Sequence, residues 1–113
     1  MNKEFDLFQK YFKEYQKQFG LTGYKVYFKY ESLDGAFADI TVEQVDMVAT
    51  VRLNPDDIPF KDVKRSAKHE ALHLLLNRLE NIARCRFYIG ESEIYEATEE
   101  IVFKLEELIK EMK

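Results

Sequence analysis

Both histidines of the chain lie four residues apart, and a glutamate directly follows the first of them. In an α-helix, which turns by about 100° per residue, His69 and His73 would share one face, about 6 Å apart along the axis. Two neutral imidazoles so placed can bind one zinc ion, and Glu70 beside them can take a proton from a water molecule. The spacing therefore predicts a metal-binding helix with an acid–base group at its side.

The alternative is a helix with two surface histidines and a solvated glutamate, because three fixed positions in five residues also arise by chance. The surroundings of the motif favour the metal site. Residues 71–76 are apolar except for the second histidine, so the histidines should border a core rather than lie on an open face.

A catalytic zinc ion takes three protein ligands and keeps a fourth position for water. The chain has no third histidine, so we expect a carboxylate from the last helix to complete the set. On an ordinary solvated helix face these acids would bind nothing. The candidates are Glu93, Glu96, Glu99 and Glu100.

Alternating and helical patterns predict the elements before the motif. Residues 3–19 form an amphipathic helix, since aromatic rings recur at every third or fourth position. Residues 24–31 and 36–42 alternate apolar and polar side chains around an Asp-Gly pair, which predicts a two-stranded hairpin. Residues 45–53 follow as a third strand, and the prolines and acids of residues 54–59 then interrupt regular structure.

The histidines fall within a predicted helix over residues 61–83, capped by Asp57 or Asp62. Residues 84–89 are expected to be extended, and Ser92 should cap a last helix that reaches Met112. The apolar positions predicted to hold this last helix against the core are Ile94, Ile101, Leu105, Leu108 and Met112.

The two helices together resemble the gluzincin peptidases, in which H-E-x-x-H is followed on the next helix by N-E-x-x-S-D. The resemblance places Glu96 at the third-ligand position and Glu100 at the position of the acid that orients the first histidine, with Glu99 the next candidate ligand. It covers residues 60–110, and it departs from the family where Tyr95 replaces the asparagine and Glu100 replaces a shorter aspartate. The short chain is similar to compact zincins of the minigluzincin and ImmA/IrrE types.

This resemblance implies a zincin-like α+β fold, with an N-terminal helix, a three-stranded, mostly antiparallel sheet, a motif helix and a C-terminal helix. It implies a zinc-dependent peptidase in which Glu70 is the general base and peptide or protein is the substrate. Residues 45–53 would be the edge strand that binds an extended peptide by strand addition.

Such a peptidase also needs a hydrogen-bond donor that stabilises the negative oxygen formed when water attacks the peptide carbonyl. The sequence does not distinguish among three candidates for this donor: Tyr88, Tyr95 and Arg84. Two other functions fit the same residues: a non-catalytic zinc domain that binds a partner protein, and an α+β interaction module that holds no metal.

Chain length and composition further restrict which classes of protein the sequence can belong to. A chain of 113 residues can build one core, so we expect a single domain over residues 1–113. The net charge of -4 gives no basic face for nucleic acid. The lone Cys85 excludes an intrachain disulfide and indicates a reducing, cytoplasmic setting, where it would be buried filler. We expect no signal peptide and no membrane span, and the oligomeric state stays open.

Overall fold

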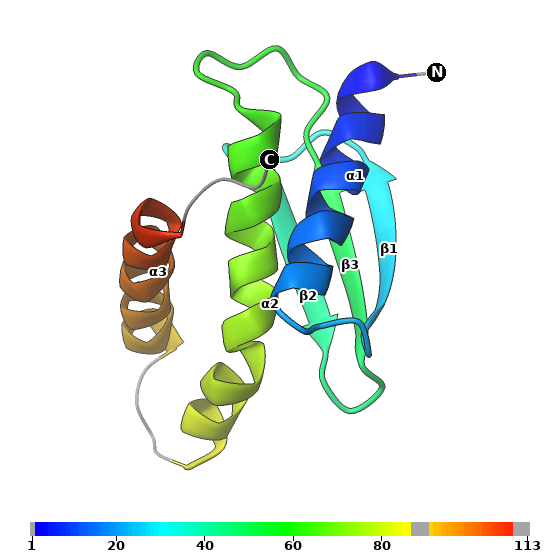
Figure 1. Cartoon of the computed structure of the whole chain (residues 1–113). Coiled ribbons are helices and arrows are strands. Elements are labelled where there is room, and N and C mark those ends of the chain that lie inside the picture. The colour runs from blue at the N-terminus through cyan, green and yellow to red at the C-terminus, as the bar shows by residue number, and fades with distance from the viewer. Residues whose placement is uncertain (1, 87–90, 110–113) are drawn as a thin grey trace.

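The structure is a computed structural model that describes residues 2–86 and 91–109. It has an α+β fold, which confirms the predicted class (Figure 1). In chain order the elements are α1 (Lys3–Gln18), β1 (Lys25–Tyr30), β2 (Ala38–Glu43), β3 (Val48–Leu53), α2 (Val63–Arg86) and α3 (Glu91–Leu108).

The sheet is mixed, with the strand order β1-β3-β2. β3 is parallel to β1 and antiparallel to β2. The predicted hairpin between the first two strands is therefore wrong, although Gly35 does turn the chain with φ 73°. Residues 31–37 instead carry the chain past the end of β3. The third strand begins at Val48, later than predicted, because the preceding residues form the turn from β2.

The crossing over β3 is held by one buried amide. The Asn54 side chain donates hydrogen bonds to the carbonyls of Leu33 (3.0 Å) and Ala36 (2.9 Å). The backbone N–H of Asn54 donates to the carbonyl of Phe37 (2.9 Å). An asparagine directly after a strand can thus satisfy several loop carbonyls that would otherwise be buried without partners.

The core lies between one face of the sheet and the pair α1 and α2. The predicted aromatic stripe of α1 is confirmed, and we expect each of its buried rings to contribute roughly 2 kcal/mol. Fully buried side chains come from α1 (Phe8, Phe12, Tyr15), β3 (Ala49, Val51, Leu53) and α2 (Ala67, Ala71, Leu74). β3 is the central strand, and its inward side chains are the most completely buried of the sheet.

The boundaries of α2 and α3 differ from the prediction. The Asp62 carboxylate accepts a hydrogen bond from the backbone N–H of Arg65 (3.1 Å), so Asp62 is the capping residue. Residues 84–86 continue α2 instead of becoming extended, and residues 87–89 lie outside the described residues. Ser92 lies inside α3, which already begins at Glu91.

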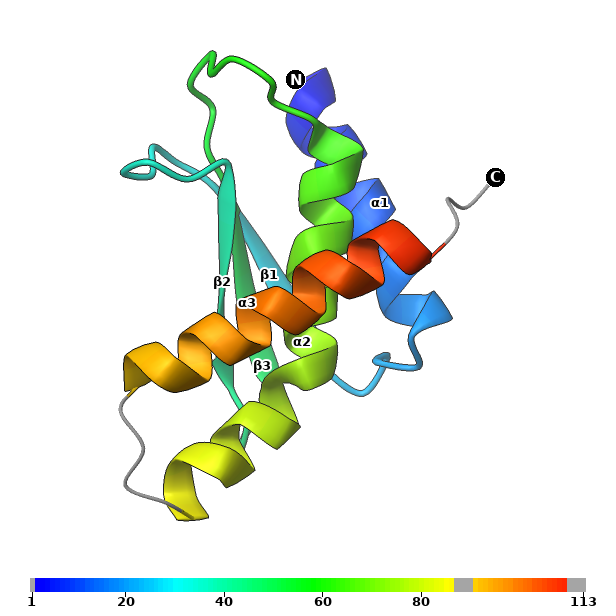
Figure 2. The ribbon, with the colours of Figure 1, turned by 90° about the vertical axis from the view of Figure 1, so that its left-hand side faces the viewer.

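α2 lies between α1 and α3 (Figure 1), and α3 crosses it obliquely (Figure 2). The inward face of α3 is rotated relative to the predicted one, which Ile94 shares and Ile101 does not. Ile94, Thr98 and Val102 are buried, whereas Ile101 is 43% exposed. The Thr98 hydroxyl donates to the carbonyl of Ile94 (2.8 Å), which lets a polar residue occupy the buried stripe.

Within residues 2–86 and 91–109, no helix combines the length and the apolar character needed to cross a membrane.

Candidate metal centre

α2 places the two imidazoles one turn apart, and α3 brings a carboxylate to them. The Nε2 atoms of His69 and His73 are 3.2 Å apart. Oε1 of Glu99 is 2.6 Å from Nε2 of His73, and Oε2 of Glu99 is 3.5 Å from Nε2 of His69. Two nitrogens and a carboxylate thus converge on one small volume.

This geometry fits a zinc ion. Four ligands at 2.0–2.1 Å in a tetrahedron would be about 3.3 Å from one another, close to the separations between the two imidazoles and between His69 and Glu99. The contact between His73 and Glu99 is shorter because the two groups can share a proton directly. Two imidazoles and one carboxylate also match the donors of catalytic zinc sites that leave one position open.

Glu106 orients the first histidine. Its Oε1 is 2.6 Å from Nδ1 of His69, and its side chain is almost fully buried. If Nδ1–H donates to this carboxylate, Nε2 of His69 keeps its lone pair for the metal. Arg65 and Lys68 hold Glu106 in turn: Nε of Arg65 is 3.4 Å from Oε2, and Nζ of Lys68 donates to its carbonyl (3.3 Å).

The carboxylates that the structure brings to α2 are not those that the resemblance selected. Glu96 and Glu100 are exposed and lie outside the group formed by the histidines. The side chain of Glu93 is outside the described residues. Glu99 and Glu106 are seven residues apart, which is two helical turns, so they share the face of α3 that meets α2. That spacing alone could not have identified Glu106 in the sequence, because Glu93, Glu100 and Glu107 are spaced in the same way.

We expect Glu106→Gln to weaken zinc binding roughly 10- to 100-fold, because the amide still accepts a hydrogen bond from His69 but carries no charge. Competition with a chromogenic zinc chelator measures this affinity. Glu100→Gln is the matched control and should bind zinc as the wild type does. If Glu100→Gln weakened binding while Glu106→Gln did not, the orienting role would belong to Glu100.

Glu70 is buried beside the site and lines the same cleft. Burial raises the pKa of its carboxyl group to about 8, and the negative charges of Asp39, Glu99 and Glu106 add to this effect. A doubly charged cation held by His69, His73 and Glu99 would oppose that shift and favour the ionised carboxylate. The carboxyl group of Glu70 therefore lies where it could accept and donate a proton during a reaction at the metal.

Two further side chains near the site have perturbed titration. Burial lowers the pKa of the His73 imidazole, with Glu99 acting in the opposite direction, and a neutral ring is the form that binds a metal. Burial and then the charge of Glu99 raise the pKa of the Tyr95 phenol, so it stays a hydrogen-bond donor.

Two of the three oxyanion candidates, Tyr95 and Arg84, line the cleft, and Arg84 pairs with Glu80. Tyr88 lies outside the described residues.

The metal centre opens into a cleft of about 840 Å³ between β2, α2 and α3. The prediction that residues 45–53 form the edge strand is wrong, because β3 pairs on both sides. β2 is the edge strand at the cleft: among the described residues it pairs with β3 alone, and residues 36–42 line the cleft. The backbone groups on its other side can therefore face a ligand.

No family model, curated protein or solved structure matches this chain.

Proposed function

We propose that this protein is a zinc-dependent peptidase whose metal is held by His69, His73 and Glu99. The observation that carries the proposal is the convergence of these three side chains at the floor of a cleft bounded by an edge strand. The resemblance of the motif helix to gluzincins supports it, with Glu99 taking the ligand role that the aligned motif gave to Glu96.

When bound, zinc supplies a Lewis acid that polarises a peptide carbonyl and lowers the pKa of a water molecule. Glu70 takes the proton from the attacking water and passes it to the leaving amine. Its place in the same cleft as His69, His73 and Glu99 suits both steps, since a bound cation would favour the ionised carboxylate that takes the proton. Glu106 keeps His69 oriented throughout the cycle.

The free edge of β2 would hold the substrate backbone in an extended conformation beside the metal. Of the three oxyanion candidates, Tyr95 lines the cleft four residues before Glu99, and its phenol, whose pKa is raised, keeps its proton while it is hydrogen-bonded to Glu99. Arg84 is less suited, since its guanidinium group is paired with Glu80. We also propose a cytoplasmic location, as expected from the cysteine content.

The test combines metal analysis with hydrolysis. We expect about one zinc ion per purified chain, cleavage of a mixed library of short peptides, and loss of cleavage on chelation that zinc restores. His73→Ala should lower the zinc content far below one per chain. Stoichiometric zinc without any cleavage would support the non-catalytic zinc-binding domain instead, and a metal-free wild type would exclude both functions.

A further inference from the structure

Three phenylalanines from separate segments line one end of the cleft. Phe37 directly precedes β2, Phe60 lies in the loop before α2, and Phe103 lies on α3. These residues are 37%, 97% and 51% exposed, respectively. The Phe103 ring lies 5.4 Å from the ring of His69, so this aromatic end adjoins the metal centre. Exposed rings grouped beside a site indicate a surface that binds an apolar group.

Phe60 occupies a backbone position that normally favours glycine. Lys61 donates from its backbone N–H to the carbonyl of Ile58 (3.3 Å), which closes a turn with Pro59 second and Phe60 third. Phe60 has φ 66°, in the left-handed region that disfavours a bulky side chain. Glycine or asparagine at this position would make the folded state more stable than phenylalanine does, so the exposed ring is better explained by a role in binding.

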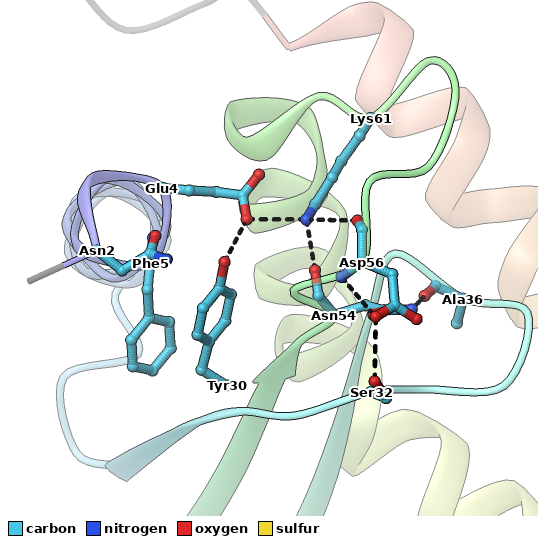
Figure 3. Close-up of polar contacts among 9 residues, drawn as sticks. All are labelled: Asn2, Glu4, Phe5, Tyr30, Ser32, Ala36, Asn54, Asp56 and Lys61. Atoms are coloured by element: carbon cyan, nitrogen blue, oxygen red, sulfur yellow. Dashed lines mark hydrogen bonds and ion pairs between the residues drawn. The ribbon is translucent and has the colours of Figure 1, made fainter.

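The neighbouring Lys61 fixes the loop that carries this ring (Figure 3). Its ammonium group is largely buried, lies 2.8 Å from Oε2 of Glu4 and donates to the carbonyls of Asn54 and Asp56. The hydroxyl of Tyr30 donates to the same oxygen of Glu4 (2.7 Å). Because Lys61 is drawn inward by these partners, Phe60 is held outward on a fixed base rather than on a loose loop.

The charged groups in the remainder of the cleft are mostly acidic, beside apolar side chains of β2 such as Ile40 and Val42. Amide groups of Asn77 and Asn81 lie toward the C-terminal part of α2, opposite the aromatic end. Two guanidinium groups line the cleft, those of Arg65 and Arg84, and each is paired with a glutamate. Six carboxyl groups also line the cleft, and one of them, Asp39, is paired with Arg52 outside it; the six are Asp39, Asp62, Glu70, Glu80, Glu99 and Glu106. Even with one doubly charged cation bound, this lining disfavours an acidic ligand.

We infer that the cleft selects an extended peptide segment with a large apolar side chain at the aromatic end and basic rather than acidic residues elsewhere. The inference rests on the proposed function for its ligand class, a peptide lying along β2. The aromatic rings would contact the apolar side chain, and the carboxylates would attract basic residues. The edge of β2 would form backbone hydrogen bonds with an extended peptide. Phe60 is the specificity-determining residue that most of the apolar preference depends on.

Binding of four fluorescein-labelled decapeptides to the zinc-loaded Glu70→Gln protein tests this inference, with fluorescence anisotropy as the readout. The peptides share a glycine–alanine background and carry either phenylalanine or serine at the centre and either lysines or glutamates at both flanks. We expect phenylalanine to tighten binding about tenfold over serine, and lysine about tenfold over glutamate at low salt. The charge preference should shrink as salt is added.

Phe60→Asn, made in the same background, should remove most of the preference for phenylalanine and leave the preference for lysine unchanged. Asparagine tolerates the left-handed backbone, so the loop should keep its shape. Val45→Asn is the matched control: Val45 is 96% exposed but lies in the turn at the opposite end of the sheet, and its removal should change nothing. Thermal unfolding of each variant checks that folding is intact.

The outcomes separate this inference from the peptidase proposal. If the wild type cleaves no peptide but binding shows both preferences, the inference stands and the peptidase activity fails. If the wild type cleaves peptides but the four decapeptides bind equally, the inference is overturned while the activity stands. An unchanged phenylalanine preference in Phe60→Asn, or no measurable binding of any decapeptide, also overturns it.

Discussion

Replacing Glu70 with glutamine should leave zinc binding near the wild-type level and slow peptide hydrolysis by roughly 100- to 10,000-fold. Glutamine has the same shape and is not a metal ligand in this arrangement, but it cannot accept a proton from water. Zinc content by elemental analysis and initial rates on a fluorogenic peptide measure the two quantities in one preparation. Hydrolysis that survives the substitution would remove Glu70 from the mechanism.

The same variant has a signature in the metal-free protein that a disrupted fold would not give. The folded state raises the pKa of Glu70 from an ordinary value of 4.5 to about 8. Between these pH values the folded protein keeps a proton that the unfolded chain loses, so wild-type stability falls as pH rises through this window. Glutamine never ionises, so Glu70→Gln should be the more stable protein at pH 8, by on the order of 4 kcal/mol, with the advantage vanishing near pH 4.5. Urea unfolding at the two pH values, with chelator present, checks this.

The parts of the fold that the sequence predicted well depend on local patterns. The aromatic stripe of α1 repeats with the period of a helix, and the motif segment combines two histidines at helical spacing with an apolar run, and both helices formed as expected. The strand order is not a local property. The Asp-Gly pair before β2 does turn the chain, but the strand with the most buried side chains took the centre of the sheet and separated β1 from β2.

The carboxylate that completes the candidate metal site was hard to predict for a related reason. Counting apolar residues alone favours an inward face through Ile94 and Ile101, which turns Glu96 and Glu100 toward the motif helix. In the structure the inward face runs through Thr98 and Val102 instead. A buried threonine that bonds its own helix, and a buried Glu106 that pairs with His69, both look polar in sequence. Their partners lie on another turn or another helix, so hydropathy cannot count them as core residues.

Because the structure turns Glu99 rather than Glu96 toward the histidines, a matched pair of variants, Glu99→Gln and Glu96→Gln, can test which of the two residues is the ligand. Glu99→Gln should reduce zinc to well below one per chain and weaken zinc affinity more than Glu106→Gln does, because it removes a ligand rather than the partner of one. Glu96→Gln alters an exposed residue that lies about 60° around the helix from Glu99 and outside the group formed by the histidines and Glu99, and should keep full zinc content and affinity. Elemental analysis and chelator competition on both variants measure the effect, and Glu100→Gln adds a second exposed control. If Glu96→Gln lost the metal while Glu99→Gln kept it, Glu96 would be the third ligand, and α3 would have to turn by about 60° about its own axis relative to α2 in the zinc-bound protein.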